Sequence, residues 1–461
     1  MLFMTLVIVA FMLIGFVLMS TEQLTHLNRA AVAMFCGVIA CVLYMLQAGD
    51  YIQLMHPDEY DEFLAGSSSS TFFVKQFVAD HILVKYIGEA CAVILFLIAT
   101  NTTVEVMYNN GVFESLTRWL RMRNSRGFLW ILSLLTAFVS FNIDNLTTVI
   151  MMMTLMNKIV RSQSQRIIFS CTILVAASIG GCCSVIGDMT SLSLWTRGVV
   201  TPTAFFSGLA PACLTSLCVF NLLMCGLLKG RVEVSSMLNS YDGDDSTLRP
   251  WQKFVMLVLG IAGIWFIPTF HYITQLPHFI GALCVLSLIW LIEGLFNIQR
   301  NVISVFVQRH YFRNTEFIGM RMILYFLGIS LAVSVLAECG ALGAIGHWLE
   351  ANIHNVYVYG LGTAALSCVV DNVPVVLMGM NMFPFDTAEG SVTPFIQNGI
   401  YWQMLSYCCA MGGTLLFVGT LAGQAVLQVA KMHLSWYLKN YVWRVVVAWI
   451  AGMAVFYFTH I

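Results

Sequence analysis

Charge is what this sequence most clearly lacks. Only 10% of its 461 residues are charged, whereas a soluble domain carries about 25% charged residues. The net charge of −1 gives no basic surplus that would indicate nucleic-acid binding. Hydrophobic residues make up 59% of the chain, and the mean hydropathy is +0.83. These values exclude an ordinary soluble domain and predict an all-α polytopic membrane protein.

Two sequence motifs are also absent. The 14 cysteines include no CxxC pair and lie mainly in apolar runs, so we expect small buried side chains rather than a metal, redox or other cofactor centre. The first run, "MLFMTLVIVAFMLIGFVLM", has no basic residue before it. It therefore predicts a first membrane span rather than a cleaved signal peptide.

What the sequence does contain is a series of apolar runs near the ~20 residues that a bilayer crossing needs. Lys and Arg, which are retained on the cytoplasmic side, cluster at 114–126, 158–166, 229–253, 300–321 and 431–444. The acidic segment 49–80, with "GSSSS", predicts a flexible external loop. The apolar runs cover about 1–19, 30–48, 82–107, 127–157, 166–196, 203–228, 251–268, 278–298, 322–340, 355–385, 397–430 and 441–459.

The run 127–157 has basic loops at both ends, so both ends belong on the cytoplasmic side. Its length of about 31 residues is short of the ~40 that two crossings need. Two arms of about 14 residues each reach roughly 21 Å at 1.5 Å per residue, which falls short of the ~30 Å hydrocarbon core. We therefore predict a re-entrant hairpin that turns within "FNIDNL", at 142–145.

The run 355–385 has the same length, but no Lys or Arg occurs anywhere from 322 to 430. It predicts a second hairpin, entering from outside and turning at "DNVP", 371–374. Pro374 is expected to end the first arm, because a proline disfavours helical geometry at the residue before it, Val373.

With two hairpins removed, ten full crossings remain, and each half holds five spans and one hairpin. The first half starts outside and the second starts inside. This predicts an inverted repeat, which is typical of secondary transporters with a site at the membrane midplane. The expected organisation is 1–228 for the first repeat, 229–250 for a cytoplasmic linker and 251–461 for the second repeat.

Paired dipeptides support the repeat. Asp144-Asn145 matches Asp371-Asn372, and each pair is followed by a double glycine, 36 residues later at Gly180 and 41 residues later at Gly412. Glycines and hydroxyl residues interrupt the runs after both hairpins, at 178–195 and 410–426. They predict discontinuous helices, because unwound backbone at that depth is tolerated only where it is buried or lines a cavity.

Three carboxylates, Asp144, Asp188 and Asp371, are expected near the membrane centre, where a charged Asp costs ~2.5–3.5 kcal/mol. Their own segments hold no basic partner, so each should be protonated, hydrated or bound to a cation. Hard oxygen ligands suit Na⁺ or Li⁺, and desolvation lets protons compete for the same carboxylate. Such a site is that of an antiporter. Neutral oxygen ligands are available from Asn145, Asn372, Ser184, Thr190, Thr414 and Thr420.

Simpler interpretations stay open for each motif. Asp-Asn pairs and Asp188 can merely cap helices, and double glycines can merely allow close packing. Glu89 and Glu105 lie 16 residues apart in the third span, too far to share one site. Each of them has two possible roles: a functional one, as a proton relay or pH-responsive group, or a structural one. The same two roles are open for Glu338.

The motifs "FNIDNLTT", "GGCCSVIGDMTSLSLW", "CVVDNVPVV" and "GGTLLFVG" resemble those of NhaD-type sodium/proton antiporters of the ion transporter superfamily. The resemblance covers about 80–430. It implies exchange of Na⁺ or Li⁺ for H⁺ in a bacterial inner membrane, by a lipid-embedded homodimer with a scaffold and a moving transport domain.

Position by position, the resemblance implies a polar core and assigns Glu89 as the acid of the third span. Ser178 stands where the family usually has Asn, so one amide ligand is missing. The candidate charged ligands of Na⁺ are Asp144 and Asp371. The full candidate set of ion ligands is Asp144, Asn145, Ser178, Asp188, Thr190, Asp371, Asn372 and Thr414.

Three other functions compete. A superfamily anion transporter, for a dicarboxylate or an oxyanion, is disfavoured because the central acids would repel its substrate. An intramembrane aspartyl protease would use a shared-proton dyad, but it has no need for the Asn that follows each Asp, so we expect no enzyme. A channel fits buried acids at two opposed hairpin tips less well than alternating access.

Overall fold

The computed structural model describes residues 2–65, 69–113, 124–228, 230–232, 248–297, 313–385, 393–417, 419–430, 432 and 434–460. Within these residues every named element is helical, and ten helices are long and apolar enough to cross a membrane. An all-α polytopic membrane protein is therefore confirmed. Most of the predicted linker 229–250 lies outside the described residues.

The first helices are α1 (Leu2–Ser20), the short α2 (Glu22–Thr25) and α3 (Arg29–Leu46). The flexible loop predicted for 49–80 is wrong for the described residues, because helices form where a proline or serine can start them. Pro57 lies in the first turn of α5, and Ser70 caps α6. Phe77 packs edge-on against Tyr60 and Phe63. The helices are α4 (Ala48–Met55), α5 (Pro57–Leu64) and α6 (Thr71–Phe77), which runs through a π-helical Val78–Leu83 into α7 (Val84–Asn109).

Both predicted hairpins are broken at their Asp-Asn pairs. The first consists of α9 (Ser125–Asn142) and α10 (Asn145–Ile159), and the second of α19 (Val356–Val369) and α20 (Asn372–Met382). The role predicted for Pro374 is wrong, since Val373 is helical and Pro374 lies in the first turn of α20. A first-turn proline is tolerated because its missing N–H would have no partner there.

The two runs that follow the hairpins are discontinuous, as predicted. The first divides into α11 (Gln163–Cys182) and α12 (Met189–Thr196), and the second into α21 (Ile400–Leu415) and α22 (Leu421–Ala430). The helices that are long enough to cross the membrane differ from the predicted set of crossings. Among the described helices, α9 qualifies as a span by length and hydropathy, whereas 397–430 does not because its two parts are short.

The same local contacts recur in both halves. Ser140, four residues before Asp144, donates to the carbonyl of Ala177 over 2.7 Å. Ser367, four residues before Asp371, donates to the carbonyl of Cys409 over 2.8 Å.

The double glycines repeat in the same way. A Cβ on Gly180 would strike the backbone of Ala137, and one on Gly412 would strike the backbone of Ala364. Each half therefore packs its hairpin against its broken helix through equivalent serine and glycine positions. That the two repeats are inverted in the membrane stays a prediction.

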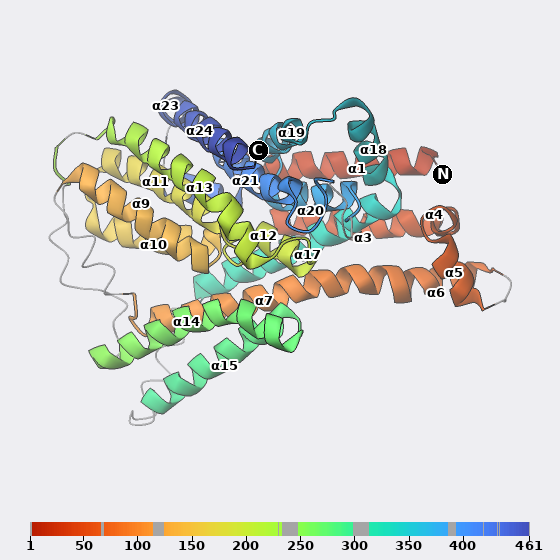
Figure 1. The fold of residues 1–461 in the computed structure, drawn as a ribbon, viewed down its shortest axis with the longest axis horizontal. Coiled ribbons are helices and arrows are strands. Elements are labelled where there is room, and N and C mark those ends of the chain that lie inside the picture. The colour runs from red at the N-terminus through yellow and green to blue at the C-terminus, as the bar shows by residue number, and fades with distance from the viewer. Residues whose placement is uncertain are drawn as a thin grey trace.

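The helices form two packed groups. In one, α9, α10, α11 and α13 (Pro202–Cys225) lie side by side, with α13 against α24 (Trp443–Thr459) and α19 against α21 (Figure 1). In the other, α3 packs on α1 and α17 (Arg313–Glu338), and α7 packs on α15 (His278–Asn297). The remaining helices are α14 (Pro250–Thr274), α18 (Ala341–Asn352) and α23 (Leu434–Tyr437), with a π-helical Leu438–Val442 before α24.

Candidate ion-binding site

Both hairpin tips meet at the carboxylate of Asp188. Asp188 is the N-cap residue of α12, but its side chain makes no capping bond to that helix. Instead, the amide of Asn145 donates to its Oδ1 over 3.2 Å, and the amide of Asn372 donates to its Oδ2 over 3.3 Å. The hydroxyl of Thr190 donates to the same Oδ2. Four of the predicted site residues are thus brought together by α10, α20 and α12.

Asp144 lies at the first hairpin tip, and both Asp144 and Asp371 lie near enough to Asp188 for their charges to act on it. Its Oδ2 accepts from the backbone N–H groups of Leu146 and Thr147, at 3.0 and 3.4 Å, and so caps α10. Its Oδ1 is buried, and no hydrogen-bond donor of the described residues reaches it. In the described part of the chain, neither Asp144 nor Asp188 is paired with a Lys or Arg. A buried carboxylate oxygen without a donor is costly, and a bound cation or a proton would satisfy it.

Asp371, at the second tip, has a different environment. Its Oδ2 lies 3.3 Å from Nη1 of Arg29, and the two side chains are only 4% and 3% exposed. The expectation that none of the three central acids has a basic partner is therefore wrong for Asp371. The arginine comes from the start of α3, far from the segments that carry the acids.

Two candidate ligands lie outside this cluster. Ser178 is buried within α11, and no hydrogen bond links it to a carboxylate in the described structure. Thr414 donates to the carbonyl of Met411, and its own carbonyl accepts from Tyr441. The structure thus brings neither hydroxyl into contact with Asp188.

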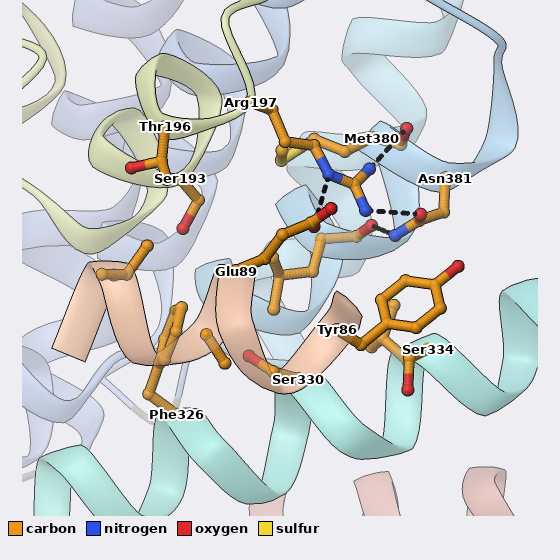
Figure 2. Close-up of a pocket in the computed structure, with 14 residues that line it drawn as sticks. Tyr86, Glu89, Ser193, Thr196, Arg197, Phe326, Ser330, Ser334, Met380 and Asn381 are labelled. Carbon is orange, nitrogen blue, oxygen red and sulfur yellow. Dashed lines mark hydrogen bonds and ion pairs between the residues drawn. The ribbon is translucent and has the colours of Figure 1, made fainter. Parts of the chain in front are cut away.

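Glu89 belongs to a second polar cluster, beside a cavity of about 40 Å³ between α7, α12, α17 and α20. Its Oε2 lies 3.1 Å from Nε of Arg197. Figure 2 shows Arg197 also reaching the carbonyl of Met380 and the side chain of Asn381, at 3.3 and 2.9 Å. Glu105 lies half-buried toward the other end of α7, so the two glutamates do not share a site.

A hydrogen-bonded chain leads from the protein surface to this cavity. Nε2 of His56 lies 2.8 Å from Oε2 of Glu338, whose Oε1 accepts from the hydroxyl of Tyr86 over 2.8 Å. Tyr86 lines the cavity beside Glu89. The hydrogen bond to Glu338 raises the pKa of His56, against the opposing effects of partial burial and the charge of Lys85.

Sequence reasoning missed Arg29, Arg197 and His56. A weak signal existed for Arg29. A positive side chain in the first turn of a helix opposes the helix dipole, so an arginine directly after the N-cap Asn28 suggests an acidic partner. Nothing comparable marks the contacts of Arg197 with Glu89 or of His56 with Glu338, which join residues 108 and 282 positions apart.

Comparison with known proteins gives matches to a transporter family and to sodium/proton antiporters. A profile described as citrate transporter (CitMHS) matches residues 10–393. "Sodium/proton antiporter 1" of Arabidopsis thaliana is 27% identical over 81% of this chain, which spans about three fifths (62%) of that relative's length. The "Na(+)/H(+) antiporter NhaD" of Vibrio cholerae is 25% identical over 89% of both chains, and that of Halomonas elongata is 24% identical over 93% of this chain and 84% of its own. The resemblance to NhaD-type antiporters is confirmed.

Proposed function

Because the chain belongs to the citrate transporter family, CitMHS, we propose that it is a secondary active transporter that exchanges Na⁺ or Li⁺ for H⁺ across a membrane. The family consists of transporters rather than enzymes. The relatives from Vibrio cholerae and Halomonas elongata, which match 89% and 93% of this chain, are named as Na⁺/H⁺ antiporters. An acidic buried centre supports the same activity for this protein.

One observation carries the proposal: in the described structure, Oδ1 of Asp144 is buried without a hydrogen-bond donor, on a carboxylate whose charge acts on Asp188, as does that of Asp371. Two neighbouring carboxylates in a medium of low dielectric repel each other strongly. A monovalent cation placed between them removes the repulsion and satisfies the orphaned oxygen. Protons on the carboxylates do the same, so cation and proton occupy the site in alternation.

The neutral residues orient the acids. Asn145, Asn372 and Thr190 all donate to Asp188, so they hold that carboxylate in place and leave their oxygen atoms available to a cation. Because the two asparagines come from opposite hairpins, a relative movement of the hairpins would change the geometry around Asp188. Such a change is what alternating access requires of a midplane site.

The family's description raises a second candidate, a citrate or other carboxylate transporter. A carboxylate substrate needs unpaired positive charge at the site. In the described residues, Arg29 and Arg197 are both paired with carboxylates, Asp371 and Glu89. Two acids without basic partners would repel citrate, so the geometry favours a cation.

The wider organisation is proposed on the same basis. The helices α3, α1 and α17, and α7 with α15, pack mainly on one another and meet the second hairpin through α20, which supports a scaffold and a moving transport domain. Many large apolar side chains face outward on α1, α14 and α15, as a lipid environment requires. The homodimer and the bacterial inner membrane stay predictions.

Everted membrane vesicles test the proposal. Addition of Na⁺ or Li⁺ to vesicles that hold a proton gradient should release protons from the vesicle interior, and citrate should neither drive proton movement nor be taken up. Citrate uptake without Na⁺-dependent proton movement would instead establish the second candidate.

A further inference from the structure

Arg29 is the most deeply buried basic side chain of the described residues, and it lies against the candidate site. Its side chain is 3% exposed and contacts the 4%-exposed carboxylate of Asp371 at 3.3 Å. Its Nε donates to the carbonyl of Met19 over 3.1 Å, which fixes the side chain near the end of α1. The guanidinium is therefore held toward the second hairpin tip rather than extended toward solvent.

A neutral charge cluster surrounds the pair. Glu22 lies 3.4 Å from Arg29 and 3.2 Å from Arg321, so two arginines face two acids. With its amide in the orientation that satisfies both ends, Gln424 of α22 accepts from Arg29 and donates to Glu22. Arg29 of α3 thus contacts the second hairpin, and Arg29 together with Glu22 of α2 contacts the second broken helix through Gln424.

In the described structure, no arginine pairs with the carboxylate at the first hairpin tip. Asp144 occupies the position equivalent to Asp371, but its side chain caps its own helix, and its Oδ1 has no donor. Asp371 makes no side-chain capping bond to α20 and turns to Arg29 instead. The two hairpin tips therefore differ in charge. In the described structure, Asp371 at the second tip is paired with the guanidinium of Arg29, whereas Asp144 at the first tip has no basic partner.

We propose that Arg29 is a tethered counter-cation for Asp371, so that a single exchangeable monovalent cation binds at Asp144 and Asp188. This inference rests on the cation-exchange function proposed above and sharpens it. Asp371 then contributes by keeping the guanidinium charge away from the cation site, and Asn372 positions Asp188. Arginine suits this role, because its charge is permanent and its planar donors match a carboxylate.

One single variant and two double variants separate this role from that of a direct ligand. In Asp371→Asn, Arg29 keeps Glu22 but loses the counter-charge of Asp371, so the cluster gains a net positive charge that repels the incoming cation, and Na⁺ activation of proton movement should weaken about tenfold or more. In the double variant Arg29→Gln/Asp371→Asn, charge balance is restored, and activation should return to within about threefold of the wild type. Asp144→Asn combined with Arg29→Gln should stay inactive.

A second readout uses purified protein and needs no transport. Na⁺ raises the unfolding temperature of a protein that binds it, and one site predicts a Hill slope near one for this stabilisation. Arg29→Gln leaves Asp371 as an extra uncompensated acid, so its Na⁺ response should become steeper, with a slope approaching two. A purely structural ion pair would lower the unfolding temperature of Arg29→Gln equally at every Na⁺ concentration.

These outcomes decide the proposal. An inactive double variant that is inserted and folded like the wild type would overturn it, as would an unchanged Na⁺ slope in Arg29→Gln. Wild-type protein without Na⁺-driven proton movement would instead refute the proposed exchange, while the Na⁺ titration of the unfolding temperature would still report whether one cation binds beside a tethered arginine.

Discussion

The amide of Asn372 donates to the carboxylate of Asp188 over 3.3 Å, which joins the tip of the second hairpin to the broken helix of the first half. Asn145 makes the matching bond from the first hairpin, over 3.2 Å. A movement of either hairpin would therefore change a hydrogen bond to the carboxylate of Asp188. The predictions below follow from this arrangement and from the packing that holds it.

Removing either amide should loosen Asp188. A hydrogen bond to a charged group contributes about 1.5–3 kcal/mol, so Asn145→Ala or Asn372→Ala should weaken Na⁺ activation of proton movement about tenfold to a hundredfold. The measurement is the Na⁺ concentration at half-maximal exchange in vesicles. Asn352→Ala is the matched control, because within the described structure that amide bonds only to the carbonyl of Trp348 in its own helix. Equal Na⁺ dependence in all three variants would refute the role of the amides.

Thr190→Val should act on the same carboxylate by a smaller amount. The substitution keeps the shape of the side chain but removes the hydroxyl that donates to Asp188, so half-maximal exchange should need about three- to tenfold more Na⁺. Thr102→Val, which removes a hydroxyl bonded only to the carbonyl of Ile98, should leave the Na⁺ dependence unchanged. The prediction fails if the two valine variants behave alike.

The glycines at the helix crossings should not tolerate a methyl group. In Gly412→Ala the new Cβ would strike the backbone of Ala364, and overpacking of this kind costs about 1–3 kcal/mol. Gly362→Ala, in the neighbouring α19, places its Cβ in open space and should be neutral or slightly stabilising. Thermal unfolding of the purified variants measures the difference, and equal unfolding temperatures would show that the crossing is not tight.

His56 should couple stability to pH. Its pKa is raised chiefly by the hydrogen bond to Glu338, with Glu59 acting in the same direction and burial and Lys85 opposing it. A raised pKa in the folded state means that the stabilisation is complete below the unfolded-state pKa of about 6.5 and disappears as pH rises through the folded-state value. His56→Gln should therefore lower the unfolding temperature more at about pH 6 than at about pH 9.

The control for this pH effect is His347→Gln. His347 is 83% exposed, and its only ion pair in the described structure is a 4.0 Å contact with Glu350, so its substitution should change stability little at either pH. A loss of stability in His56→Gln that is the same at both pH values would show that the histidine acts only by packing.

Much of the site was predictable because its signals are local. Asp and Asn are strong N-caps, so Asp144-Asn145 and Asp371-Asn372 marked the breaks in both hairpins without any knowledge of the fold. The glycines at 180 and 412 lie at tight crossings, which is the close-packing interpretation that the sequence left open for the double glycines. These signals depend on the backbone conformation of a few consecutive residues, which the sequence states directly.

The errors arose where a distant partner decides the outcome. The pairing of Arg29 with Asp371 joins residues 342 positions apart, and a pattern of apolar runs contains no information about which helix ends meet. The segment 49–80 was predicted to be a loop from its acidity, but packing among Tyr60, Phe63 and Phe77 orders it as helices. Pro374 was read as a break although a first-turn proline starts a helix equally well.

The most direct test of the central claim compares wild-type protein with Asp144→Asn in everted vesicles, over a range from about pH 6 to about pH 9, at equal amounts of membrane-inserted protein. The amide keeps the size of the side chain but removes the charge that would bind Na⁺ or H⁺. We predict that Na⁺-dependent proton movement is lost at every pH in this variant. Exchange at the wild-type rate would contradict the assignment of Asp144 as the carboxylate that carries the transported ion.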